Sequence, residues 1–275
     1  MNLLKAIATV SGLTTISRVL GFVRDILVAA VLGAGFLADV FFVAFKLPNL
    51  FRRMFAEGAF TAAFVPQFSR FLEERGSKAA QEFAEQALAV LLWSLLVFVL
   101  IGEMAMPWLV LAFAPGFLGD PDKLNLAVLL SRITFPYLLF ISIVSLMSGV
   151  LNCLGRFAAA AATPIILNIC LITAILWLAN YTPSPAHGLA WGVTVAGSIQ
   201  LFWLLFNVSS AGFGLRLFLP KLTPAVKILA RRIFPVAIGA GVYQISLLVD
   251  TVVASLLPTG SISYLFFADR VNQLP

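Results

Sequence analysis

The chain has 275 residues, of which 61% are hydrophobic and only 11% charged, and its mean hydropathy is +1.03. A soluble globular domain is about 45–50% apolar and about 25% charged, so this composition excludes a soluble domain and indicates a polytopic membrane protein. The formal net charge of +6 does not indicate nucleic-acid binding, because the basic residues are divided between loops and apolar segments.

Apolar segments predict seven complete membrane-spanning helices and the start of an eighth. The seven lie at residues 7–32, 34–64, 84–114, 124–151, 158–179, 189–208 and 228–257. The eighth begins near Ser261 and is cut off at Pro275. About 20 apolar residues cross a bilayer, so each complete segment is long enough. We therefore expect an all-α fold, a polytopic bundle of transmembrane helices.

The loops between these segments alternate in charge. Basic residues lie before the first segment and after the second, fourth and sixth, whereas the opposite loops contain one basic residue, Lys123. The positive-inside rule places the basic loops and the N-terminus in the cytoplasm. We expect the first six spans to form three out-and-back hairpins.

An internal repeat relates the two ends of the chain. Residues 25–42 align with residues 250–267 at one constant offset of 225, sharing an aspartate, a turn glycine and two phenylalanines. Six predicted spans separate the copies, and an even number gives both copies the same orientation. Parallel repeats of this kind build two-lobed transporters. We expect residues 1–222 to form an N-terminal lobe, residues 223–275 to begin a C-terminal lobe, and the chain to be a fragment of a protein nearly twice as long.

Arginines inside or at the ends of the predicted spans are the most informative residues. An arginine at the centre of a bilayer helix costs about 2.5–3.5 kcal/mol on insertion scales, so several of them require a wet cavity or an anionic partner. The acids of the first two spans are too few to neutralise every base, and a planar guanidinium suits bidentate contact with phosphate. This favours phosphate binding by Arg18, Arg24 and Arg52.

The alternative is that the intramembrane charges form structural ion pairs between packed helices. This interpretation applies best to Lys46, Arg53 and Glu57, since the last two are four residues apart on one helix. Glu103 and Arg132, on the third and fourth spans, could pair in the same way.

Asp250 lies in the middle of the seventh predicted span, and no basic residue lies between Arg232 and Arg270. A lone carboxylate at that depth is costly and needs a partner. Either it is protonated or paired with a helix of the second lobe, or it binds a sodium ion or proton that couples transport to an ion gradient. We expect no cofactor and no metal site, since the two cysteines lack metal-ligand spacing and His187 has no acid beside it.

A family resemblance is carried by residues 17–25 (SRVLGFVRD), 38–53 (ADVFFVAFKLPNLFRR) and 55–60 (FAEGAF), with shorter matches at 115–117, 134–137 and 267–270. These stretches closely resemble the MurJ (MviN-type) lipid II flippases of bacteria. The resemblance implies the multidrug/oligosaccharidyl-lipid/polysaccharide exporter fold, with two six-helix lobes around a cationic cavity. It also implies a multi-pass protein of the bacterial cytoplasmic (inner) membrane that serves cell-wall biogenesis and cell shape.

The resemblance assigns roles to single residues as well. It makes four arginines the pyrophosphate-binding residues, Arg18, Arg24, Arg52 and Arg270. It groups further polar residues around the same cavity, namely Ser17, Asp25, Asp39, Lys46 and Arg53. In some members of the family a sodium site lies on the helix that corresponds to the one carrying Asp250.

The function expected from these features is a flippase that moves the undecaprenyl-pyrophosphate-linked peptidoglycan precursor to the outer leaflet by alternating access, without catalysis. Its partners would be the lipid-linked precursor, membrane lipid and proteins of cell-wall synthesis. The rivals are an exporter of another lipid-linked oligosaccharide, a cation-coupled drug antiporter of the same fold and a membrane enzyme acting on polyprenyl pyrophosphates. An antiporter would favour an acidic cavity, and an enzyme would need a catalytic acid, base or metal site, which the sequence does not show.

Overall fold

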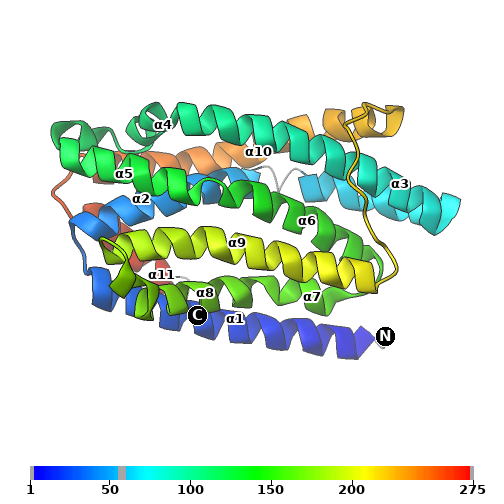
Figure 1. Ribbon diagram of the computed structural model, residues 1–275, viewed down its shortest axis with the longest axis horizontal. Coiled ribbons are helices and arrows are strands. Elements are labelled where there is room, and N and C mark those ends of the chain that lie inside the picture. Colours follow the sequence, from blue (N-terminus) through cyan, green and yellow to red (C-terminus); the bar gives the residue numbers. More distant parts are fainter. Residues whose placement is uncertain (1–2, 55–59, 273–275) are drawn as a thin grey trace.

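The computed structural model describes residues 3–54 and 60–272. Figure 1 shows a bundle of long helices that run along one axis of the molecule, and the described residues contain no strand. The expected all-α bundle is therefore confirmed. The helices follow one another as α1 (Leu3–Leu32), α2 (Phe36–Phe51), α3 (Thr61–Met104), α4 (Met106–Phe113), η2 (Pro115–Gly119), α5 (Pro121–Thr134), α6 (Tyr137–Cys153), α7 (Phe157–Ala161), α8 (Thr163–Leu176), η3 (Leu178–Tyr181), α9 (Pro185–Ser210), α10 (Pro224–Ser255) and α11 (Ser261–Asn272).

Five stretches of the described chain are long and apolar enough to cross a membrane. They are Thr61–Met104, Pro121–Cys153, Phe157–Leu176, Pro185–Ser210 and Pro224–Ser255, and they correspond to the third to seventh expected spans. The second expected span begins with α2, which has 16 residues, and its full length stays a prediction. The segment that follows α2 enters residues 55–59, outside the described part. The chain is a multi-pass membrane protein.

The direction of the helices alternates along the chain, as the loop pattern predicts. Figure 1 shows the N-terminus at the same end of the bundle as the long connection between α9 and α10, while the α1–α2 and α10–α11 turns lie at the opposite end. The expected connection between the second and third spans is a sharp bend at Gly76, with helix on both sides of it. Gly76 has a φ of 79°, which glycine adopts without the steric penalty of a side chain.

The two copies of the internal repeat pack against each other. Phe42 of α2 stacks on Phe266 of α11 with ring centroids 3.9 Å apart. The turns also meet, since a Cβ built on Gly260 would lie 3.0 Å from the carbonyl oxygen of Ala34. The division into lobes at residues 222 and 223 stays a prediction, although the extended segment between α9 and α10 ends at that point.

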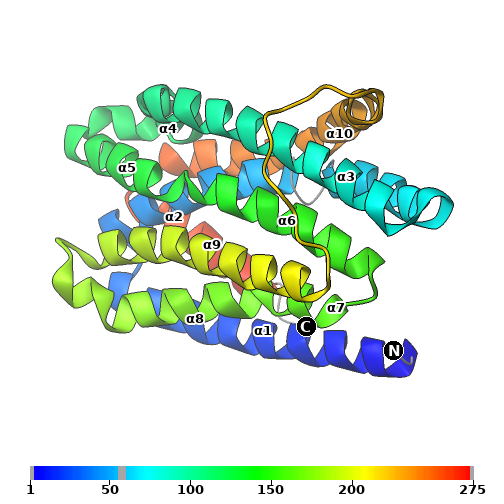
Figure 2. The same cartoon turned by 45° about the vertical axis from the view of Figure 1, so that its right-hand side comes forward.

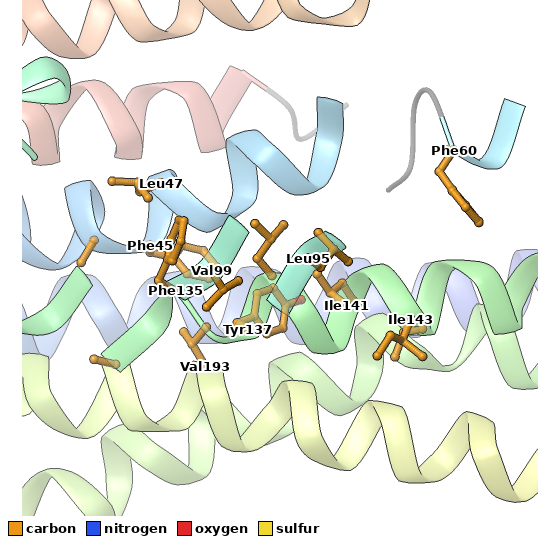
Figure 3. Packing of buried hydrophobic residues seen from close by; sticks show 14 of the residues in the cluster. Phe45, Leu47, Phe60, Leu95, Val99, Phe135, Tyr137, Ile141, Ile143 and Val193 are labelled. Carbon is orange, nitrogen blue, oxygen red and sulfur yellow. The ribbon is translucent and has the colours of Figure 1, made fainter. Parts of the chain in front are cut away.

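The core that supports these helices is aromatic and tightly packed. Figure 3 shows Phe135 and Tyr137 at the start of α6, with Phe45 from α2, Val99 from α3 and Val193 from α9 around them. Two glycines let neighbouring helices approach the rings closely. A Cβ on Gly102 of α3 would lie 2.3 Å from the Phe135 ring, and one on Gly197 of α9 would lie 2.7 Å from the Tyr137 ring. This packing fixes the position of α2, which forms one wall of a large cavity.

Candidate substrate-binding cavity

A cavity of about 930 Å³ lies between α1, α2, α8, α10 and α11. Its size is near the upper end of the range for ligand sites, about 300–1,000 Å³. Among the described residues that line it, two are acidic, Asp25 and Asp269, and six are basic: Arg18, Arg24, Lys46, Arg52, Arg53 and Arg270. The excess of basic side chains creates a positive potential that attracts anions.

Helical spacing explains why these side chains meet. Lining residues on α1 fall at 17–18, 21–22 and 24–25, and those on α2 and the helical turn directly after it fall at 42, 45–46, 49–50 and 52–53. Intervals of three and four residues place side chains on one face of a helix. The sequence therefore already directs the polar residues of α1 and α2 to a common side, and the fold supplies the opposite walls.

Arg24 is the most firmly held of the cavity arginines. Its Nε and Nη2 donate hydrogen bonds of 2.9 and 2.7 Å to Oδ1 of Asp25, and its Nη1 donates a 2.8 Å bond to Oδ1 of Asn168. Arg24 is buried, with 8% of its surface exposed. These bonds use three of the five guanidinium N–H donors. A side chain oriented in this way still has donors for an anion in the cavity.

Asn168 was missed by the sequence reasoning. It lies on α8 and is buried, its Nδ2 donates a 2.9 Å hydrogen bond to the carbonyl oxygen of Ser17, and its Oδ1 accepts the bond from Arg24. The amide packs against α1 at Gly21, where an added Cβ would lie 3.5 Å from Nδ2. The signal was available: an amide inside an apolar span usually bonds to a neighbouring helix.

Asp25 joins the two copies of the repeat across the cavity. Its Oδ1 accepts from Arg24, and its Oδ2 lies 3.4 Å from Nε of Arg270 on α11. The guanidinium carbon of Arg270 is also 4.9 Å from the ring centroid of Phe266. One carboxylate therefore holds an arginine from α1 and an arginine from α11.

The other basic residues differ in how they are engaged. Arg52 donates from Nε to Oδ1 of Asn49 at 3.0 Å, and Lys46 donates to Oγ1 of Thr251 at 2.6 Å. Arg18 and Arg53 are exposed. Neither forms a hydrogen bond or ion pair that the structure records among the described residues. The cavity thus contains cations that the described acids do not neutralise.

Asp39 does not belong to the cavity, and the expectation that grouped it there is corrected. It is buried with 1% exposed and forms a 3.1 Å ion pair with Nζ of Lys123. Its oxygens also accept from the backbone N–H of Gly260 at 2.7 Å, and from the backbone N–H and the hydroxyl of Ser263 at 3.0 and 2.6 Å. Asp39 therefore ties α2 and α5 to the start of α11, at the end of the bundle opposite the N-terminus.

Asp250 is not among the lining residues, although its neighbour Thr251 contacts the lining residue Lys46. It is exposed on α10, and the described residues provide it with no recorded ion pair or hydrogen bond. The neighbouring Thr251 is fully buried and accepts the bond from Lys46. The described residues contain no group of three or more His, Cys, Asp or Glu side chains that could hold a metal ion.

The alternative interpretation, in which intramembrane charges form structural ion pairs, included the pairs Glu103–Arg132 and Arg53–Glu57. Glu103 and Arg132 form no salt bridge within the described structure, and Oε1 of Glu103 is buried without a hydrogen-bond partner there. Glu57 lies outside the described residues, so the pair with Arg53 stays a prediction.

Comparison with known proteins identifies a family. The family model described as "Lipid II flippase MurJ" matches residues 28–275. The "Probable lipid II flippase MurJ" of Rhizobium tropici is 45% identical over an alignment of 279 residues, which covers 100% of this chain and 52% of the relative. The "Lipid II flippase MurJ" of Burkholderia cenocepacia is 38% identical over 279 residues, again 100% of this chain and 54% of the relative. The chain therefore spans about half the length of the curated relatives it matches.

Solved structures share the fold. A structure titled "Lipid II flippase MurJ, inward closed conformation" matches with a TM-score of 0.76 and 24% identity, over 97% of this chain and 54% of that one. An inward-facing multidrug resistance MATE family transporter of the MOP superfamily matches with a TM-score of 0.72 and 13% identity, over 94% and 58% of the two chains. At these identities the likeness establishes the fold alone.

Proposed function

Because the chain belongs to the MurJ lipid II flippase family, we propose that it carries the pyrophosphate-binding part of a flippase for the undecaprenyl-pyrophosphate-linked peptidoglycan precursor. The protein would move this lipid from the inner to the outer leaflet of the bacterial inner membrane. The pyrophosphate would bind the cavity arginines while the lipid tail stays in the membrane.

The observation that carries this proposal is the excess of basic over acidic side chains around the cavity. A pyrophosphate diester is anionic and offers several acceptor oxygens, and arginine binds such groups through paired N–H donors. Arg24 retains two N–H donors after its bonds to Asp25 and Asn168. Arg18 supplies a further cation on the same face of α1. This arrangement suits an anionic headgroup far better than a neutral one.

The same observation weighs against a drug antiporter for cationic compounds. Bringing a cation into a cavity lined by six basic and two acidic described residues would oppose like charges. An exporter of another lipid-linked glycan stays as the second candidate, because its pyrophosphate would use the same arginines. The described residues that contact the pyrophosphate would not distinguish the two glycans.

Contacts at one end of the bundle support alternating access. The turns of the two repeats meet at Ala34 and Gly260, and Asp39 bonds to both Gly260 and Ser263. These contacts hold the bundle closed at the end opposite the N-terminus. In the proposed cycle they form while the substrate binds and separate when the arginines are exposed to the other side. The charge of the loops supports a cytoplasmic N-terminus.

Binding to purified full-length protein in lipid nanodiscs tests the proposal, with undecaprenyl pyrophosphate, undecaprenyl monophosphate and undecaprenol as ligands. We expect affinity to fall in that order. A hydrogen bond to a charged group contributes about 1.5–3 kcal/mol, so Arg18→Ala, Arg24→Ala or Arg52→Ala should each weaken pyrophosphate binding by about 10- to 100-fold. Lysine should restore it only in part, because it lacks the paired donors.

Arg132→Ala is the matched control, since Arg132 is exposed on α5 and is not among the lining residues. It should bind the pyrophosphate lipid as the unmodified protein does. Equal affinity for undecaprenol and undecaprenyl pyrophosphate would refute the proposed role of the cavity. So would normal growth of a flippase-depleted strain complemented by a variant with alanine at all three arginine positions.

A further inference from the structure

The connection between α9 and α10 is an extended segment, residues 211–223, which we call the strap. Figures 1 and 2 show it at the end of the bundle that also carries the N-terminus, where it passes along the outside of the helices. The proposed transport function does not use it. Its exposed side chains are nevertheless unusual for a loop.

The strap is fixed to α3 rather than loosely suspended. Gln81 donates from Nε2 to the carbonyl oxygen of Gly214 at 2.7 Å, and the backbone N–H of Arg216 donates to Oε1 of Glu85 at 3.0 Å. The Thr223 hydroxyl donates to Oε1 of Gln86 at 2.7 Å. Near its start, Phe213 is buried against Phe68, with ring centroids 5.8 Å apart. These bonds orient the strap and leave its middle facing outward.

The outward-facing part of the strap is apolar. Its large side chains are exposed by more than half, at 65% for Leu217, 53% for Phe218, 74% for Leu219 and 65% for Leu222. Such a cluster is costly in water. The structure records no hydrogen bond from the backbone N–H groups of residues 217–219 to a described residue. Unpaired backbone groups are excluded from hydrocarbon, so the cluster cannot lie in the hydrocarbon core either. The membrane–water interface satisfies both constraints.

The strap and most of α10 carry only basic charges, although the strap also contacts Glu85 of α3. Residues 211–249 contain five basic residues and no acidic residue. All five are exposed, and none forms an ion pair with a described residue: Arg216, Lys221, Lys227, Arg231 and Arg232. Basic side chains beside exposed leucine and phenylalanine are typical of segments that bind anionic lipid at a membrane surface.

We infer that the strap is a membrane-surface anchor, in which Leu217, Phe218, Leu219 and Leu222 insert below the headgroups while Arg216 and Lys221 bind anionic phospholipids. The strap binds the lipid leaflet at whose surface α9 ends and α10 begins. The strap connects α9 to α10. The anchor would therefore hold this connection between the two expected lobes at the lipid surface. This inference does not depend on the identity of the transported substrate.

Site-specific quenching tests the anchor in the full-length protein. Phe218→Cys is introduced after replacement of Cys153 and Cys170, labelled with the NBD fluorophore, and reconstituted in nanodiscs that contain equal mole fractions of brominated phosphatidylglycerol or brominated phosphatidylcholine. We expect strong quenching by both lipids, at least twofold stronger with the brominated anionic lipid. Arg216→Gln together with Lys221→Gln should abolish the difference between the lipids and leave the quenching by phosphatidylcholine.

Leu118→Cys is the matched control. Leu118 is 69% exposed in η2, at the opposite end of the bundle and close to Asp120 and Asp122. Its label should not prefer the anionic lipid. Equal quenching at position 218 by the two lipids would overturn the anionic-lipid site, and absence of quenching by both would show that water or another part of the protein covers the strap. A strap variant that loses the lipid preference should still bind undecaprenyl pyrophosphate, so the two proposals fail independently.

Discussion

Asn168 on α8 accepts a 2.8 Å hydrogen bond from Arg24 on α1, although 144 positions separate the two residues in the chain. The same amide donates to the backbone carbonyl of Ser17, two turns before Arg24 on the same face of α1. Asn168 therefore links the side chain of a cavity arginine to the backbone of its own helix. It acts as a positioning residue for Arg24, which is buried and has few alternative partners.

We predict that Asn168→Leu weakens pyrophosphate-lipid binding by about 10-fold through Arg24, since a hydrogen bond to a charged group contributes about 1.5–3 kcal/mol. Isothermal or fluorescence titration with undecaprenyl pyrophosphate measures the effect, with Asn207→Leu, a half-buried position on α9 that does not line the cavity, as the control. In an Arg24→Ala background, Asn168→Leu should have no further effect. Additive losses in that double-mutant cycle would show that Asn168 does not act through Arg24.

Gly116→Ala should loosen the closed end of the bundle. The backbone N–H of Gly116 donates to Oγ of Ser255 at 3.2 Å, and an added Cβ would lie 1.8 Å from the carbonyl oxygen of the same residue. Backbone at that distance must move, and overpacking costs about 1–3 kcal/mol. Thermal unfolding of the purified protein should show a lower midpoint for Gly116→Ala.

Gly119→Ala provides the comparison for this effect, because nothing lies within 4 Å of an added Cβ there. Its unfolding midpoint should match that of the unmodified protein, as expected for open surface positions. Equal midpoints for the two variants would contradict the close contact between η2 and the end of α10.

Loop charge predicts a cytoplasmic N-terminus. Single cysteines at Ser77 and Tyr181, both exposed, lie at opposite ends of the bundle and should differ in labelling by an impermeant thiol reagent. After replacement of Cys153 and Cys170, only Tyr181→Cys should react in intact spheroplasts, and Ser77→Cys should react once the membrane is opened. The reverse pattern would invert the topology and with it the proposed direction of transport.

Asp250→Asn tests the proposed coupling site. Asp250 is exposed on α10, and the adjacent Thr251 bonds to Lys46 of the cavity. If Asp250 binds a sodium ion or proton, its replacement by asparagine should weaken the dependence of flipping on that ion gradient and leave pyrophosphate binding unchanged. A reconstituted flipping assay at varied sodium concentration and pH measures this, and unchanged ion dependence would leave Asp250 with a structural role.

Much of the architecture could be predicted because it depends on local properties of the chain. Hydropathy located the third to seventh spans, and the positions of cavity residues on α1 and α2 follow from intervals of three and four. Local patterns failed where geometry departs from a continuous helix. The residues on both sides of the bend at Gly76 are helical, which composition did not predict for that connection.

The sequence by itself determined the membrane class, the set of intramembrane charges and the family, because composition, periodicity and motif residues can be read without knowing which helices are neighbours. Only the tertiary structure decided how those charges are paired. Asp39 meets Lys123 and Ser263, which are 84 and 224 residues away, and leaves the cavity as a result. Asp25 likewise acquires Arg270 from α11, 245 residues away. Ion pairs depend on distances of a few ångströms between helices, and packing across the whole bundle sets those distances.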